Sequence, residues 1–322
     1  MIILVTGASG FVGSHIVEHA LAAGHEVWAA MRPTSSRRWL TDRRIRFIML
    51  GDVINSDVTF DAIVWCAGIT KALHSGEFEE VNNRQMQVFV EALRANNRLP
   101  KYFLFMSSLS AHTPASAYGR SKLHAAEWIK EQRDLVPIVL YPTGVYGPRD
   151  KDYLQQFSNI RSGFDFVPSL SQEQKLTFIY VEDLAEVVLR CLSLADGIVR
   201  ENGHCDAIEM DVAEPRVYSN TEFRNLILDE MSAASSSKKR KAVMVLRLPA
   251  WFVRLVCSIS GFMARVCGRP SLLNSDKALI LTQIDWTADT SGMQELLGYL
   301  PPTSLRDGIR LTYEWYKKNG CL

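Results

Sequence analysis

The sequence has little net charge, few cysteines and no long uncharged apolar run, and each shortage disfavours a class of protein. The 322 residues carry a formal net charge of +1, so the chain as a whole gives no electrostatic reason to bind nucleic acid. Its six cysteines form no CxxC pair and have no nearby histidine ligand set, so we expect neither a metal site nor a disulfide framework. No apolar run of about 18 residues is free of charge, which argues against a membrane-spanning helix. Because we find no secretory leader, we expect a cytoplasmic protein. We also expect its partner to be a small-molecule substrate.

The first thirteen residues carry the motif around which the rest of the chain is organised. Residues 1–5 form a short apolar run typical of a buried strand, and apolar residues at helical spacing follow over 14–23. Three glycines between them allow the backbone to approach a pyrophosphate, and the helix N-terminus presents free N–H groups to it. The sequence therefore predicts a dinucleotide-binding turn whose contacts come from Gly7, Ser9, Gly10, Phe11, Val12 and Gly13.

The end of the second predicted strand, residues 25–31, indicates which dinucleotide binds. Arg32 follows this strand, and hydroxyl side chains lie close by in the sequence. An acidic residue at this position would accept hydrogen bonds from ribose hydroxyls, whereas an arginine suits a 2′-phosphate. We therefore favour NADP(H), with NAD(H) as the alternative. Arg37 and Arg38 can equally be solvated surface residues.

Further strands are predicted over residues 45–50, 61–66 and 102–106, with helical spacing over 79–96. Such alternation is typical of a parallel, doubly wound α/β sheet, in which ligands bind at the carboxyl ends of the strands. Asp52 follows one of these strands and is expected to accept a hydrogen bond from the adenine amino group. Further cofactor contacts are expected from the neighbouring strand-end residues Val53, Ala67 and Gly68.

Side chains suited to carbonyl chemistry follow the fifth predicted strand. Tyr118 and Lys122 are four residues apart, so they share one face of a predicted helix. A phenol titrates near 10, and a neighbouring ammonium group can stabilise its phenolate and hold the nicotinamide ribose. We predict that Tyr118 is the acid–base group, with Lys122 as its partner and Ser108 as the hydroxyl that orients the carbonyl. Ser107 and Ser110 remain alternatives for the orienting hydroxyl.

The ordered motifs resemble those of the extended short-chain dehydrogenase/reductases, also called the NAD-dependent epimerase/dehydratase family. They are TGxxGxxG at 6–13, SS at 107–108, YxxxK at 118–122, YPTGVYGP at 141–148 and FIYVEDLA at 178–185. The carboxyl-terminal residues 286–320 resemble the dihydroflavonol-reductase and 3β-hydroxysteroid-dehydrogenase-like members. The resemblance implies a Rossmann-type fold with a smaller carboxyl-terminal substrate region. It also implies that the nicotinamide end of the cofactor is bound by Pro142, Gly144 and Val145.

Three departures from the family pattern refine the functional prediction. Ser108 and Tyr118 lie closer together than is usual, and Tyr141 stands where an arginine commonly precedes the proline. A sugar-nucleotide dehydratase would carry Asp-Glu after the strand-end hydroxyl, but this chain has Leu109 and Ser110, so we disfavour dehydration. We predict hydride transfer between NADP(H) and a carbonyl or alcohol carbon. The alternatives are a nucleotide-sugar epimerase with tightly bound NAD and a non-catalytic dinucleotide-sensing protein.

The chain is expected to divide into a nucleotide-binding part, residues 1–146, and a mainly substrate-binding part, residues 147–322. Residues around 176–190 are expected to complete the sheet. Aromatic residues in the second part are candidates for an apolar pocket, and they are Phe157, Phe164, Phe166 and Tyr180.

The stretch 238–269 has the most unusual composition. It contains eight basic residues and no acidic one, so the rest of the chain carries −7 when this +8 is subtracted from the total of +1. Residues 249–267 are predicted to form a helix whose apolar surface carries one basic stripe. Three interpretations remain open: packing against its own domain, a homodimer interface, or peripheral contact with an anionic membrane that supplies a lipid-like ketone.

Overall fold

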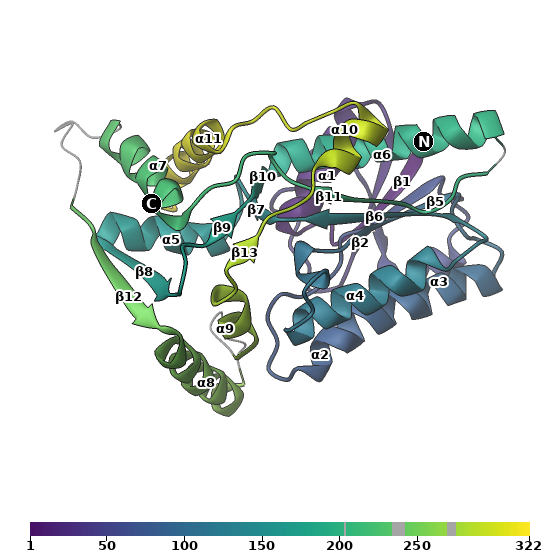
Figure 1. The fold of residues 1–322 in the computed structure, drawn as a ribbon. Helices are drawn as coiled ribbons and strands as arrows, with labels where there is room; N and C mark the ends of the chain where they lie inside the picture. The colour runs from purple at the N-terminus through teal and green to yellow at the C-terminus, as the bar shows by residue number, and fades with distance from the viewer. Residues whose placement is uncertain (203, 234–241, 269–274) are drawn as a thin grey trace.

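A parallel sheet forms the centre of the computed structural model, which describes residues 1–202, 204–233, 242–268 and 275–322 (Figure 1). Within this part of the chain the sheet has seven strands in the order β11-β6-β5-β4-β1-β2-β3, and every pair of neighbours is parallel. The strands are β1 (Ile2–Thr6), β2 (Glu26–Met31), β3 (Arg46–Met49), β4 (Ala62–Trp65), β5 (Tyr102–Met106), β6 (Val136–Pro142) and β11 (Ile208–Val212). The predicted doubly wound α/β fold is confirmed.

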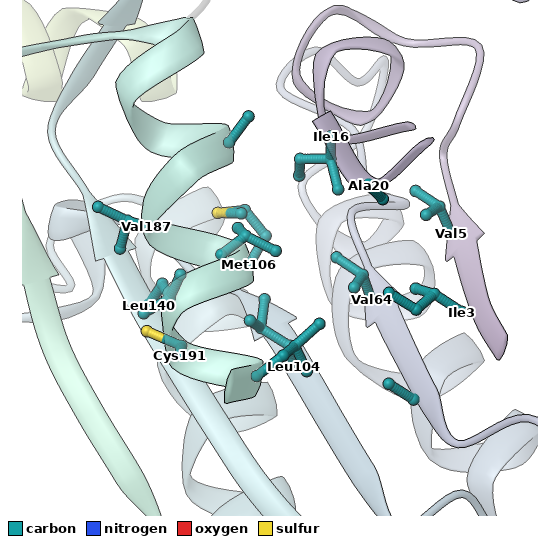
Figure 2. Close-up of a cluster of buried hydrophobic side chains, with 14 of the residues drawn as sticks. Ile3, Val5, Ile16, Ala20, Val64, Leu104, Met106, Leu140, Val187 and Cys191 are labelled. Carbon is teal, nitrogen blue, oxygen red and sulfur yellow. The ribbon is translucent and has the colours of Figure 1, made fainter. Parts of the chain in front are cut away.

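Helices cover both faces of the sheet, because successive side chains of each strand point to opposite faces. Ile3 and Val5 pack into a core with helices α1 (Phe11–Ala22) and α6 (Val181–Asn202), and Figure 2 shows part of this cluster. Leu4 points the other way, into a core with helices α3 (Gln85–Ala95) and α4 (Ala117–Lys130). Shorter helical segments link these elements, namely η1 (Leu50–Asn55), α2 (Gly76–Glu79), the π-helical turn η2 (Glu80–Arg84) and the 3₁₀ turn η3 (Leu109–Ala111).

The strand that completes the sheet is β11, not the predicted region around 176–190. Within that region β10 (Phe178–Tyr180) pairs with β7 (Gly144–Tyr146) outside the main sheet, and α6 follows directly. Parallel neighbours such as β6 and β11 need a crossover connection between them, and α6 is part of that connection. Strand β11 alternates apolar and acidic residues, as an edge strand does, so its sequence lacks the continuous apolar pattern of the inner strands.

Most of the remaining described elements form a second region beside the sheet (Figure 1). A third core lies within this region, with Tyr146, Phe157, Phe223, Ile309 and Tyr316 among its buried side chains. Strand β8 pairs with β12, and β9 pairs with β13. The elements of this region are α5 (Asp152–Ser162), β8 (Phe164–Ser169), β9 (Lys175–Leu176), α7 (Asn220–Ala233), β12 (Met244–Pro249), α8 (Ala250–Cys267), α9 (Ser275–Leu281), β13 (Asp285–Trp286) and α11 (Leu305–Lys318). Helix α10 (Ser291–Leu297) instead packs against β11 and α6, and its Met293 belongs to the core of the main sheet. The division at residue 146 stays a prediction.

Helix α8 forms where the sequence predicts a helix over 249–267. By length and composition alone it is apolar enough to cross a membrane, although only 17% of it is buried in the protein. The expectation against a membrane-spanning helix stays a prediction, because this stretch is not free of charge and contains Arg254 and Arg265. Within the basic stretch 238–269, Lys238 to Lys241 and Arg269 lie outside the described residues.

Candidate active site

The glycine-rich turn between β1 and α1 leaves no room for larger residues. Gly7 has a φ of +64°, and a Cβ there would lie 2.8 Å from the carbonyl carbon of Cys66. A Cβ on Gly13 would overlap the carbonyl oxygen of Gly7, whereas Gly10 donates its N–H to that oxygen at 2.9 Å. The glycines therefore bring the start of α1 close against the end of β1.

The N-terminus of α1 is free to bind an anion. The Ser14 N–H donates to the Gly10 carbonyl at 3.1 Å, and no side chain caps the helix. In the part of the chain that the structure describes, the N–H groups of Phe11, Val12 and Gly13 have no acceptor, and Ser9 lies in the turn just before them. Free N–H groups at the positive end of a helix fit the pyrophosphate of a dinucleotide.

Arg32 stands directly after β2, and its guanidinium has no hydrogen-bond or ion-pair partner among the described residues. The nearby cations are engaged: Arg37 lies 4.0 Å from the centre of the Phe47 ring and Arg38 lies 4.4 Å from that of Trp39. Arg32 is thus the arginine of the three that is available to an anionic ligand. Asp52 is exposed and Val53 buried in η1, which follows β3.

Asn82 is a buried residue that supports the site and that our sequence analysis missed. It is buried in the turn η2, and its Oδ1 accepts the Ile69 N–H at 2.8 Å. Its Nδ2 donates to the Ile69 carbonyl and to the Ser121 hydroxyl, both at 3.1 Å. Asn82 therefore joins the loop after β4, which holds Ala67 and Gly68, to helix α4. The signal in the sequence was weak, a polar pair within an apolar helical pattern.

The structure brings Ser108 and Tyr118 together. Ser108 follows β5, its hydroxyl accepts the Ser110 N–H at 3.2 Å, and its side chain lies near enough to the Tyr118 phenol to act against the rise in that group's pKa. Ser107 instead bonds the Lys122 carbonyl at 3.4 Å, and Ser110 is buried. The turn η3 accommodates the short spacing between Ser108 and Tyr118, because it leads into α4 within a few residues.

Burial shifts the pKa of Tyr118 and the pKa values of two ionisable groups near it. It raises the pKa of Tyr118, and the interaction with the Ser108 hydroxyl acts in the opposite direction. Burial lowers the pKa of Lys122 to about 8, and the Lys122 ammonium donates to the Met106 carbonyl at 2.7 Å. Across the described residues no hydrogen bond joins Lys122 to the Tyr118 hydroxyl. Burial also raises the pKa of the Cys66 thiol to about 12, so this cysteine is uncharged near neutral pH.

The N-terminus of α4 is held by a carboxylate from far along the chain. Asp276 of α9 accepts the N–H groups of Ala117 and Tyr118 at 2.6 and 3.0 Å. Ser116 caps the same helix by accepting the Gly119 N–H at 2.9 Å. Helix α9 therefore fixes the start of the helix that carries Tyr118 and Lys122, a contact that our sequence analysis missed.

A cavity of about 590 Å³ connects these features. The predicted residues that line it are Phe11, Val12, Gly68, Ser107, Ser108, Ser110, Tyr118, Lys122, Pro142, Gly144 and Val145. Its apolar wall includes Ile69, Leu176, Phe178, Phe223, Ile280, Leu281 and Trp286. The aromatic residues that we predicted lie elsewhere, since Phe157 and Tyr180 belong to the third core and Phe164 and Phe166 are exposed.

The chain belongs to the NAD dependent epimerase/dehydratase family, whose family model matches residues 3–202. The predicted family is thereby confirmed, and membership identifies a dinucleotide-dependent enzyme. A ceramide reductase of Caulobacter vibrioides is 27% identical over 330 residues, which cover 100% of this chain and 96% of that protein. A UDP-glucose 4-epimerase of Vibrio cholerae is 22% identical over 96% of this chain and 94% of its own.

Solved structures share the fold. The UDP-glucose 4-epimerase of Thermotoga maritima superimposes with a TM-score of 0.73 at 18% identity, covering 99% of both chains. A UDP-glucuronic acid 4-epimerase from Bacillus cereus, solved with NAD, has a TM-score of 0.70 at 19% identity and covers 99% of both chains.

Proposed function

We propose that the protein uses NADPH to reduce a ketone in a long-chain, ceramide-type lipid. The observation that carries the proposal is the proximity of the Ser108 and Tyr118 side chains at the wall of a cavity that also reaches the glycine turn and Lys122. Support for reduction also comes from the free Arg32 guanidinium, which suits a cofactor with a 2′-phosphate.

Each side chain of the site has its own role in the proposed reduction. When bound, a nicotinamide cofactor would supply the hydride that the carbonyl carbon accepts. Ser108 donates a hydrogen bond to the carbonyl oxygen, and Tyr118 transfers its phenolic proton to that oxygen, which completes the alcohol. The Lys122 ammonium would bind the nicotinamide ribose and stabilise the phenolate form of Tyr118. The N–H groups at the start of α1 would bind the pyrophosphate, and the backbone of Pro142, Gly144 and Val145 would contact the nicotinamide end.

The cavity favours a lipid over a nucleotide sugar. Its wall is largely apolar, and Asp150, Asp152 and Asp276 also line it. Lys122 is the sole basic lining residue among those described. Three carboxyl groups with one buried lysine disfavour the diphosphate of a nucleotide sugar. The full-length similarity to a ceramide reductase points to the same class of substrate.

The test is NADPH consumption with a ceramide-type ketone dispersed in mixed micelles. We expect turnover by the native protein and a loss of at least about 100-fold in Tyr118→Phe, because proton transfer by a positioned side chain contributes about that much. NADPH affinity should survive the substitution. Tyr102→Phe is the matched control, because the Tyr102 hydroxyl bonds Asp196 at 2.8 Å at the opposite end of its strand from the site.

Two results would overturn the proposal in different ways. Co-purified NAD that survives dialysis, together with interconversion of UDP-sugars, would establish the epimerase alternative. Binding of NADPH with turnover that is the same in native protein and Tyr118→Phe would remove the proposed mechanism. Binding without turnover of any ketone or nucleotide sugar would favour a dinucleotide sensor.

A further inference from the structure

Helix α8 presents an apolar face to solvent that the proposed reaction does not use. Eight of its large apolar side chains are between 37% and 67% exposed. At about 100° per residue they fall within an arc of about 140° around the helix. This apolar arc consists of Trp251, Phe252, Leu255, Val256, Ile259, Phe262, Met263 and Val266.

The rest of the helix is organised around that arc. Cys257 and Ala264, the two buried residues of α8, lie on the side that faces the protein. Arg254, Ser258 and Arg265 are exposed and, with Gly261, form a basic stripe along one border of the apolar arc. The helix thus has an inner face, an apolar outer face and a cationic border, the pattern of a helix that lies in a membrane interface.

In the sequence, the charged residues in and around the α8 segment are of one sign. No acidic residue occurs between Glu230 and Asp276, and the eight basic residues of this stretch contrast with the net −7 of the rest of the chain. Strand β12 ends at Pro249, where α8 begins, and it pairs with β8. Phe164 and Phe166 of β8 are also exposed, with their rings stacked at 6.5 Å. Apolar exposure therefore continues from α8 into the β8–β12 pair.

We propose that α8 lies flat in the interface of an anionic membrane, with its apolar arc among the acyl chains and its basic stripe at the headgroup phosphates. A second copy fits this surface less well, because a two-fold interface would place one basic surface against another. A spanning helix fits less well too, because both Arg254 and Arg265 would enter the hydrocarbon.

The position of α8 gives a lipid a short route to the cavity. Helix α9 packs against α8, and its Ile280 and Leu281 line the cavity beside Tyr118. A long-chain substrate leaving the bilayer at α8 would therefore meet the cavity at α9. This part of the proposal rests on the proposed function, whereas membrane binding itself does not.

The test is sedimentation of the full chain with vesicles of phosphatidylcholine, with and without phosphatidylglycerol. We expect the protein to pellet with the anionic vesicles and to be released as salt rises. Ile259→Asp combined with Phe262→Asp should abolish pelleting. Arg254→Gln combined with Arg265→Gln should weaken it by roughly 25-fold, since each basic residue near an anionic surface contributes about fivefold. Val88→Asp is the matched control, because Val88 is 68% exposed on α3, away from α8.

The outcomes separate this proposal from the proposed function. NADPH affinity is measured on every variant, so that a variant that has lost its fold is not mistaken for one that has lost membrane binding. The sedimentation test does not depend on catalytic turnover. Absence of pelleting, or equal pelleting by the double aspartate variant, would overturn the proposal. It would also be overturned by a dimer that the aspartates dissociate without any vesicle binding, or by protein that neither salt nor alkaline carbonate releases from vesicles.

Discussion

Arg32 is the residue on which dinucleotide preference depends in our proposal. Replacing it with Gln should weaken NADPH binding by about 10- to 100-fold, because hydrogen bonds to a charged group contribute about 1.5–3 kcal/mol. NADH binding should change little. Isothermal titration with each dinucleotide measures both affinities.

Arg38→Gln is the control for Arg32, because the Arg38 guanidinium already lies over the Trp39 ring. It should leave the ratio of the two affinities unchanged. Equal effects of the two substitutions would mean that general positive charge, rather than a specific contact of Arg32, attracts the cofactor.

Lys122 should set the alkaline limit of the reaction. Burial lowers its pKa to about 8, so the ammonium loses its proton as the pH rises through that value. Burial raises the pKa of Tyr118, so the phenol keeps its proton over the same range. We therefore expect kcat/KM for reduction to fall above about pH 8.

Lys122→Arg should move this fall to higher pH, because a guanidinium stays charged, although the changed geometry lowers the maximal rate. The measurement is a pH profile of kcat/KM for both proteins under saturating NADPH. An unchanged alkaline midpoint in the variant would assign the limit to another group.

At the scale of elements, α9 holds the start of α4 through the Asp276 carboxylate. Asp276→Asn keeps one acceptor oxygen but loses the negative charge at the helix N-terminus, which should cost about 0.5–2 kcal/mol of stability. Because Tyr118 lies in the first turn of α4, we also expect kcat to fall severalfold while NADPH affinity is kept.

The matched control is Asp289→Asn, since the Asp289 carboxylate accepts the N–H of Ser291, the first residue of α10, at 3.0 Å. It should lower the Tm without lowering kcat. If both variants lose the same stability and keep full kcat, Asp276 is a helix cap and does not position Tyr118.

At the scale of the whole molecule, α11 closes the third core against the strand pair β7–β10. A Cβ on Gly308 would overlap the phenol of the buried Tyr146. Gly308→Ala should therefore destabilise the protein by about 1–3 kcal/mol, the usual cost of overpacking. Denaturant unfolding of the full chain measures this change.

Gly197→Ala in α6 is the control, because nothing lies within 4 Å of the added Cβ. It should be neutral or stabilise by up to about 1 kcal/mol, since alanine favours helix more than glycine does. A Gly308→Ala protein as stable as the control would show that α11 does not press on Tyr146.

The sequence by itself determined the family and most of the parallel sheet of the first half of the chain. Short apolar runs, helical spacing and glycines at a strand end are local signals, and a parallel sheet brings its strand ends to one edge whatever the loops do. Gly7, Ser108, Tyr118 and Lys122 could therefore be named as candidates from their spacing alone.

Only the tertiary structure decided the contacts between distant segments. The hydrogen bonds of Asp276 to α4 join residues 158 and 159 positions apart in the sequence, and that of Asn82 to Ser121 joins residues 39 apart. No local sequence pattern predicts such contacts. Strand β11 was missed because one of its faces is polar. The apolar surface of α8 has the same composition whether buried or exposed, so the packing around the helix alone distinguishes a core helix from one that faces solvent.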